Sequence, residues 1–110
     1  MKQTITKAGL SPGQRRLLEL MQEVNFGHIF GLTVCEGEPV FDPPLRVTRD
    51  IKIGGENGPR PEAHLNDFAL KSKVEEFFEH LTRLGNGIVE KIEIKHGLPF
   101  RITLEEKIKT

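Results

Sequence analysis

Residues 17–37, LLELMQEVNFGHIFGLTVCEG, and residues 77–97, FFEHLTRLGNGIVEKIEIKHG, carry one pattern twice at an offset of 60 residues. In the first half of each stretch, apolar residues recur at the spacing of one helix face. In the second half they alternate with polar residues. These periodicities predict a helix followed by a strand. Each stretch ends at a glycine, Gly37 or Gly97, where a tight hairpin turn is expected. We interpret the repetition as an internal duplication of a helix–hairpin unit.

A second strand follows the turn in both copies. The first copy carries about five extra residues around 41–43, and beyond them the offset becomes 55. Residues 44–48, PLRVT, then match residues 99–103, PFRIT. This alignment predicts that Arg46 and Arg101 occupy equivalent positions in the two halves.

Capping residues mark where the helices begin. Ser11 can cap a helix that has Pro12 at its first position and Gln14 as the capping-box partner. The start of the second helix is open between Asn66 and Ser72, because either residue can act as the cap. The expected elements are a helix over 12–24, strands over 30–35 and 45–53, a second helix ending at Leu84, and strands over 88–94 and 100–105.

One helix on one hairpin buries too little apolar surface to be stable alone, so we expect the two units to share a core. The sequence therefore predicts a single α+β domain with αββαββ order, in which a four-stranded antiparallel sheet carries both helices on one face. Repeat one spans about 11–53, a Gly/Pro-rich linker spans 54–65, and repeat two spans about 66–108.

Alternation along the strands assigns side chains to the two faces of the predicted sheet. The helix side is expected to receive Phe30, Leu32, Val34, Leu45, Val47, Ile92, Ile94, Phe100, Ile102 and Leu104. The outward face is expected to receive Arg46, Thr48, Asp50, Lys52, Lys91, Glu93, Lys95, Arg101, Thr103, Glu105 and Lys107. The outward set holds no aromatic residue.

Composition excludes several classes of protein. The 110 residues include 16 basic and 16 acidic side chains, so no net charge attracts the whole chain to nucleic acid or to a membrane surface. The single Cys35 cannot form an internal disulfide, which argues against a stapled secreted scaffold. No apolar run suits a membrane span or a signal peptide. We therefore expect a cytoplasmic protein that does not interact with membranes.

Short segments in both halves resemble the small bacterial YezD-like proteins, which carry one such unit. The residues that carry the resemblance are NFGHI (25–29) with TVCEG (33–37), and GNGI (85–88) with EIKHG (93–97). Members of that family tend to have Asp before the turn glycine, where this chain has Glu36 and His96. The resemblance implies the architecture of each half and assigns no activity or site residue.

Residues that often carry chemistry are scattered rather than grouped. None of the four histidines has another His, Cys or carboxylate at the usual spacing of metal ligands. Cys35 has no base at a defined spacing, and a small strand residue without reactivity is the simpler interpretation. Glu75, Glu76 and Glu79 fit a solvated helix face. We therefore expect no enzyme, no cofactor and no metal.

The segment 54–61, GGENGPRP, is the most distinctive loop and is missing from the second copy. Backbone amides at Gly54, Gly55 and Gly58, together with Arg60, could hold an anion. The Lys-Ser/Thr pair and the following helix of a phosphate-binding loop are missing, however. A linker between the repeats is favoured, and a small-ligand or enzymatic site at this loop is kept as an alternative.

The outward face of the sheet is the strongest candidate for binding. Its basic residues are Arg46, Lys52, Lys91, Lys95, Arg101 and Lys107. A basic open sheet can bind nucleic acid, a solvated face of mixed charge is the plain alternative, and a bare sheet can also associate with a second copy. The main hypothesis is a small non-enzymatic binding or interaction module that forms a homodimer. A weak nucleic-acid binder is the alternative.

Overall fold

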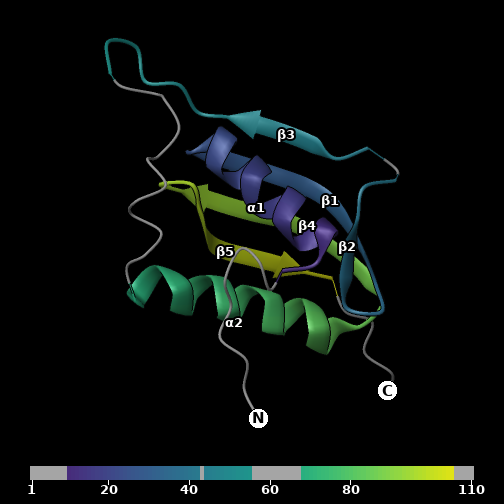
Figure 1. The fold of residues 1–110 in the computed structure, drawn as a ribbon. Coiled ribbons are helices and arrows are strands. Elements are labelled where there is room, and N and C mark those ends of the chain that lie inside the picture. Colours follow the sequence, from purple (N-terminus) through teal and green to yellow (C-terminus); the bar gives the residue numbers. More distant parts are fainter. Residues whose placement is uncertain (1–9, 43, 56–67, 106–110) are drawn as a thin grey trace.

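Both helices cover the same face of one antiparallel sheet, and no helix of the described residues lies on the other face (Figure 1). The computed structural model describes residues 10–42, 44–55 and 68–105. The elements are α1 (Pro12–Val24), β1 (Gly27–Cys35), β2 (Glu38–Val40), β3 (Arg46–Arg49), α2 (Phe68–Leu84), β4 (Gly87–Lys95) and β5 (Leu98–Leu104). The predicted α+β fold is confirmed, and α2 begins between the two candidate caps. None of the described helices is both long and apolar enough to cross a bilayer.

The start of α1 follows the predicted capping box. The backbone N–H of Gln14 donates to Ser11 Oγ at 3.1 Å, and the N–H of Ser11 donates to Gln14 Oε1 at 3.0 Å. These two bonds satisfy donors that a helix start leaves unpaired. The helix then buries one side against the sheet, with Leu17 and Met21 completely inaccessible to solvent.

Strands β1 and β4 form the centre of the sheet, and their pairing is symmetric. Gly27 lies opposite Ile94, and Val34 lies opposite Gly87. Adding 60 to the first residue of one pair, and subtracting 60 from the second, gives the other pair. Each pair along this ladder except Phe30–Lys91 has a mate under this relation, as expected for two equivalent units related by a twofold axis.

Each hairpin turn is bound to the end of the helix in the other half. The N–H of Gly37 donates to the Gly85 carbonyl at 2.7 Å, and the N–H of Gly97 donates to the Asn25 carbonyl at 2.9 Å. The two bonds correspond under the offset of 60. They join the halves outside the sheet as well as within it.

The second strand of the first half is interrupted, which differs from the prediction. β2 and β3 both pair with β1, so the sheet has five strands where four were expected. Asp42 and Pro44 lie in the break, and a proline has no backbone N–H to donate to a β-ladder. β3 also ends at Arg49, so the expected strand over 45–53 is too long.

The change of offset to 55 does not describe the pairing. Pro99 lies opposite Ile94, and the equivalent partner in the first half is Pro39, which lies opposite Val34. The predicted equivalence of the two arginines is therefore wrong. Arg46 lies opposite Phe30, whereas Arg101 lies opposite Glu93. The break before β3 shifts this strand along β1, and sequence similarity alone does not reveal that shift.

Two aromatic residues predicted on the helix side are not buried beneath the helices. Gly31 has a φ of 73°, and the alternation of β1 breaks there, so that Ile29 and Leu32 are both buried beneath the helices. Phe30 consequently faces away from them. Phe100 sits beside an irregularity in the β4–β5 register and is 48% exposed.

The core lies between the two helices and the inner face of the sheet. β1 and β4 supply its floor, α1 and α2 its cover, and hydrophobic residues make up almost all of it. The buried members are Leu10, Leu17, Leu18, Met21, Val24, Ile29, Leu32, Val34, Val74, Phe77, Phe78, Leu81, Val89, Ile92, Ile94 and Leu98.

Candidate functional site: the open face of the sheet

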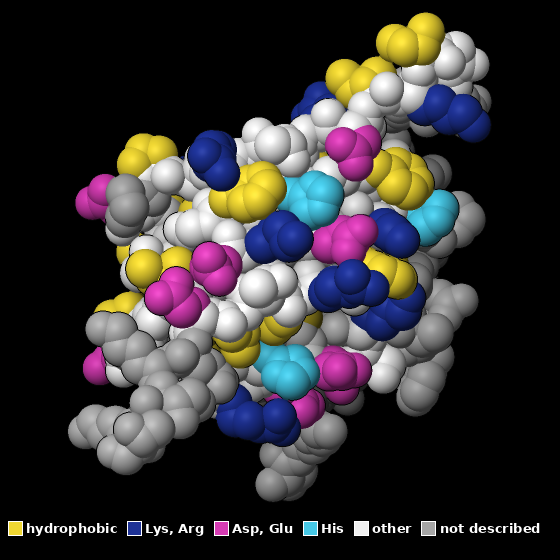
Figure 2. Space-filling view, turned by 180° about the vertical axis from the view of Figure 1, so that it is seen from behind, with side chains coloured by type: hydrophobic (Ala, Val, Ile, Leu, Met, Phe, Trp, Pro, Cys, Tyr) yellow, Lys and Arg dark blue, Asp and Glu magenta, His cyan; other side chains and the backbone are white. Residues whose placement is uncertain are grey.

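The helix-free side of the sheet combines aromatic rings with basic side chains. Figure 2 shows this side, where hydrophobic and histidine side chains lie among Lys and Arg over the strands. We call it the open face, and it comprises His28, Phe30, Arg46, Thr48, Lys91, Glu93, Lys95, Phe100, Arg101 and Thr103. Its residues come from strands β1, β3, β4 and β5.

Two rings lie side by side on the central strand β1. The centroids of His28 and Phe30 are 5.8 Å apart and their planes differ by 27°, which is a stacked arrangement. Two residues before His28, the ring of Phe26 meets the ring of His96 edge-on, with centroids 4.8 Å apart. The expectation that the outward face holds no aromatic residue is therefore wrong.

Basic side chains cover the rings of the open face. The guanidinium carbon of Arg46 lies 4.8 Å from the centroid of Phe30. Lys95 Nζ lies 4.0 Å from the centroid of Phe100, and the guanidinium carbon of Arg101 lies 5.7 Å from it. Contacts of this kind hold the cations above apolar surface while leaving their charges in solvent.

Lys91 stands between the two groups of rings. It lies opposite Phe30 on one neighbouring strand and opposite Thr103 on the other. The acidic residue among them is Glu93, whose Oε1 lies 3.9 Å from Arg101 Nε. Arg101 is largely exposed in this pair, so the attraction is weak and leaves the guanidinium accessible.

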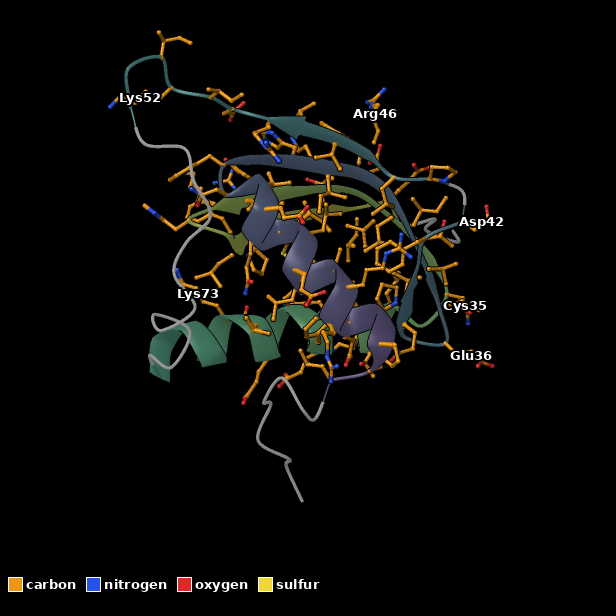
Figure 3. The ribbon with its side chains drawn as sticks, turned by 45° about the horizontal axis from the view of Figure 1, so that its top comes forward. Cys35, Glu36, Asp42, Arg46, Lys52 and Lys73 are labelled. Atoms are coloured by element: carbon orange, nitrogen blue, oxygen red, sulfur yellow. The ribbon has the colours of Figure 1, made fainter. Side chains whose placement is uncertain are left out.

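Four of the six predicted basic residues thus meet on the open face. Lys52 does not belong to it, because β3 ends earlier and its carbonyl accepts a bond from Gly55 in the following turn. Figure 3 shows Lys52 at the corner of the molecule, away from Arg46. Lys107 lies outside the described residues.

The glycine-rich loop is described only at its beginning. Gly54 and Gly55 form a turn, in which Gly54 has a φ of 82°. Gly58 and Arg60, the other two residues of the predicted anion site, lie outside the described residues. The alternative of a ligand site at this loop stays a prediction.

Two open grooves lie on the helix side, at corresponding places in the two halves. A groove of about 300 Å³ runs between α2 and β5, and His80 and Phe77 contribute to its walls. A groove of about 550 Å³ runs between α1 and the β2–β3 segment, where the guanidinium carbon of Arg16 lies 4.4 Å from the centroid of Phe41. Phe100 and Arg101 also line the groove beside α2, but no other predicted binding residue lines either groove.

The other candidate residues lie apart from the open face. Cys35 is a free, exposed thiol at the end of β1 (Figure 3), so it does not fill a gap in the core. His80 lies on α2, 3.7 Å from Glu76, as an ordinary pair one helical turn apart. Among the residues that the structure describes, no three His, Cys, Asp or Glu side chains lie close enough together to hold a metal ion.

No family model, no curated protein and no solved structure matches the chain.

Proposed function

We propose that this protein is a non-enzymatic binding module whose open face binds single-stranded nucleic acid. The observation that carries the proposal is the pair of stacked rings, His28 and Phe30, bordered by Arg46 and Lys91. Exposed rings on a sheet can stack with bases, and basic groups beside them can contact phosphates. A surface whose only role is to be solvated does not require the aromatic rings of His28 and Phe30.

Single strands fit this surface better than a duplex does. The bases of a duplex are stacked on one another, so rings on a broad sheet cannot reach their faces. A single strand can turn its bases toward the rings while its phosphates lie against the cations. The stacking supplies an attraction that salt does not screen, and the four basic residues supply one that salt weakens.

Fluorescence anisotropy with a labelled single-stranded oligonucleotide tests the proposal. We expect binding whose logarithmic affinity falls with the logarithm of salt concentration, with a slope of about −3 if all four cations contact phosphates. The double variant Lys91→Glu, Lys95→Glu should bind at least about tenfold more weakly and show a shallower salt dependence. Its matched control is Arg15→Glu, Arg83→Glu on α1 and α2, which makes the same charge change away from the open face and should bind normally.

A second variant separates stacking from charge. Phe30→Leu keeps an apolar side chain but removes the ring, so we expect a several-fold loss of affinity with an unchanged salt slope. Equal binding by wild type and both open-face variants would contradict the proposal, as would equal weakening by the control variant on the helices.

A further inference from the structure

β3 is an edge strand with one side unpaired by any described strand. It pairs with β1, and Figure 1 shows no other described helix or strand on its outer side. The opposite edge of the sheet is β5, which contains Pro99 and an irregular register. Proline and bulges hinder the addition of a further strand, so β3 is the better edge for pairing with another chain.

Apolar side chains at β3 and just beyond it are exposed. Val47 is 39% exposed, Ile51 58% and Ile53 93%. Val47 and Ile51 stand two positions on either side of Arg49 in one row, and Val47 lies opposite the buried Ile29. The helices pack on β2 and β5 more than on β3, which explains why this row is uncovered. A strand laid beside β3 would bring its own side chains against the row.

The backbone of β3 can accept such a strand. The N–H of Asp50 donates to the Phe26 carbonyl at 2.8 Å, so the backbone of Asp50 is turned toward β1. Backbone groups of neighbouring residues in an antiparallel ladder point in opposite directions. Val47 and Arg49 therefore direct their N–H and C=O groups toward the free edge.

We infer that β3 pairs in antiparallel fashion with β3 of a second copy, about a twofold axis through Thr48. Val47 of one copy then lies opposite Arg49 of the other, with their backbone groups hydrogen-bonded. Arg46 lies opposite Asp50 of the second copy, and the symmetry forms this ion pair twice. Both copies of the ion pair between Arg46 and Asp50 fall at non-hydrogen-bonded positions of the ladder, where facing side chains are closest.

Shifting the two β3 strands past each other by two residues also keeps side chains on matching faces of the joined sheet. The charges of Arg46 and Asp50 favour the unshifted register over both shifted ones. A shift of two residues in one direction sets Arg46 opposite Lys52 of the second copy, which is repulsive. The same shift in the other direction sets Asp50 opposite Pro44 and loses the ion pair. The short edge suits a weak, reversible dimer, and its formation does not depend on nucleic-acid binding by the open face.

Sedimentation velocity over a range of protein concentrations, without nucleic acid, tests the inference through a charge exchange. The wild type should show a monomer–dimer equilibrium. Asp50→Arg sets arginine opposite arginine at two places and should weaken the dimer roughly tenfold or more. Arg46→Asp with Asp50→Arg restores both pairs with reversed polarity and should return the dimer close to wild-type strength. Circular dichroism confirms that each variant is folded.

Glu105→Lys, beyond the end of β5, is the control with a comparable charge change and should leave the dimer unchanged. A wild type that stays monomeric at every concentration would overturn the inference. A dimer that Asp50→Arg does not weaken, or that the double exchange does not restore, would overturn it equally.

Discussion

Gly27 allows β3 to lie close against β1. A Cβ atom built at this position would overlap the Thr48 carbonyl oxygen, which belongs to the backbone and can move only if β3 moves with it. The equivalent Gly87 in β4 differs, because its nearest neighbour is the flexible end of the Leu84 side chain at 3.2 Å. Two glycines at the same place in the repeat therefore carry different constraints.

This difference predicts unequal effects of the same substitution. Gly27→Ala should lower the free energy of unfolding by about 2–3 kcal/mol, since β3 must move away from β1. Gly87→Ala should change it by less than about 1 kcal/mol. Urea denaturation of the two variants measures both values, and equal losses would show that β3 does not press on Gly27.

At the residue scale, the sequence predicted the core well and the open face poorly. Leu32, Val34, Ile92 and Ile94 are buried as expected. Simple alternation along the strand assigns Phe30 to the wrong face of the sheet, because Gly31 adopts a positive φ that breaks the alternation. A glycine inside a strand is a known sign of such a break, so the sequence held the clue to the aromatic surface.

Among the elements, α1 depends most clearly on one residue. Ser11 caps the helix through Gln14, and its Oγ also donates to Glu38 Oε1 at the start of β2. The same side chain thus joins the helix to the hairpin. Removing it leaves a helix donor without its partner and releases this link.

Ser11→Ala should therefore lower the free energy of unfolding by about 1 kcal/mol, whereas Ser11→Thr, which keeps the hydroxyl, should cost only a few tenths. Thermal or urea denaturation followed by circular dichroism provides the comparison. An alanine variant as stable as the wild type would show that the cap does not contribute.

The element order was predictable, but the lengths of the strands were not. The helix stripes, the capping box and the two x-Gly turns mark α1, α2 and both hairpins in the sequence. At the break between β2 and β3, the sequence predicted only an insertion of extra residues. No local sequence feature indicates that the strands on both sides of the break pair with β1. That choice depends on the position of β1 beside β4, which is a tertiary contact.

At the scale of the whole molecule, the two halves are locked by reciprocal contacts at their turns. Gly37 binds the end of α2 and Gly97 the end of α1. Beside the turn at Gly97, the ring of Phe26 meets the ring of His96, and beside the turn at Gly37, the N–H of Glu36 donates to Asn86 Oδ1 at 3.0 Å. These pairs occupy positions that correspond under the offset of 60, but they use different chemistry.

This arrangement places both helices on one side and leaves the opposite side to the rings and cations. Chemical-shift mapping of the isotope-labelled protein, titrated with a single-stranded oligonucleotide, tests that division directly. The account predicts the largest changes at the amides of His28, Phe30, Lys91 and Arg101, with the amides of α1 and α2 nearly unmoved. No change at saturating oligonucleotide, or changes concentrated in the helices, would contradict it.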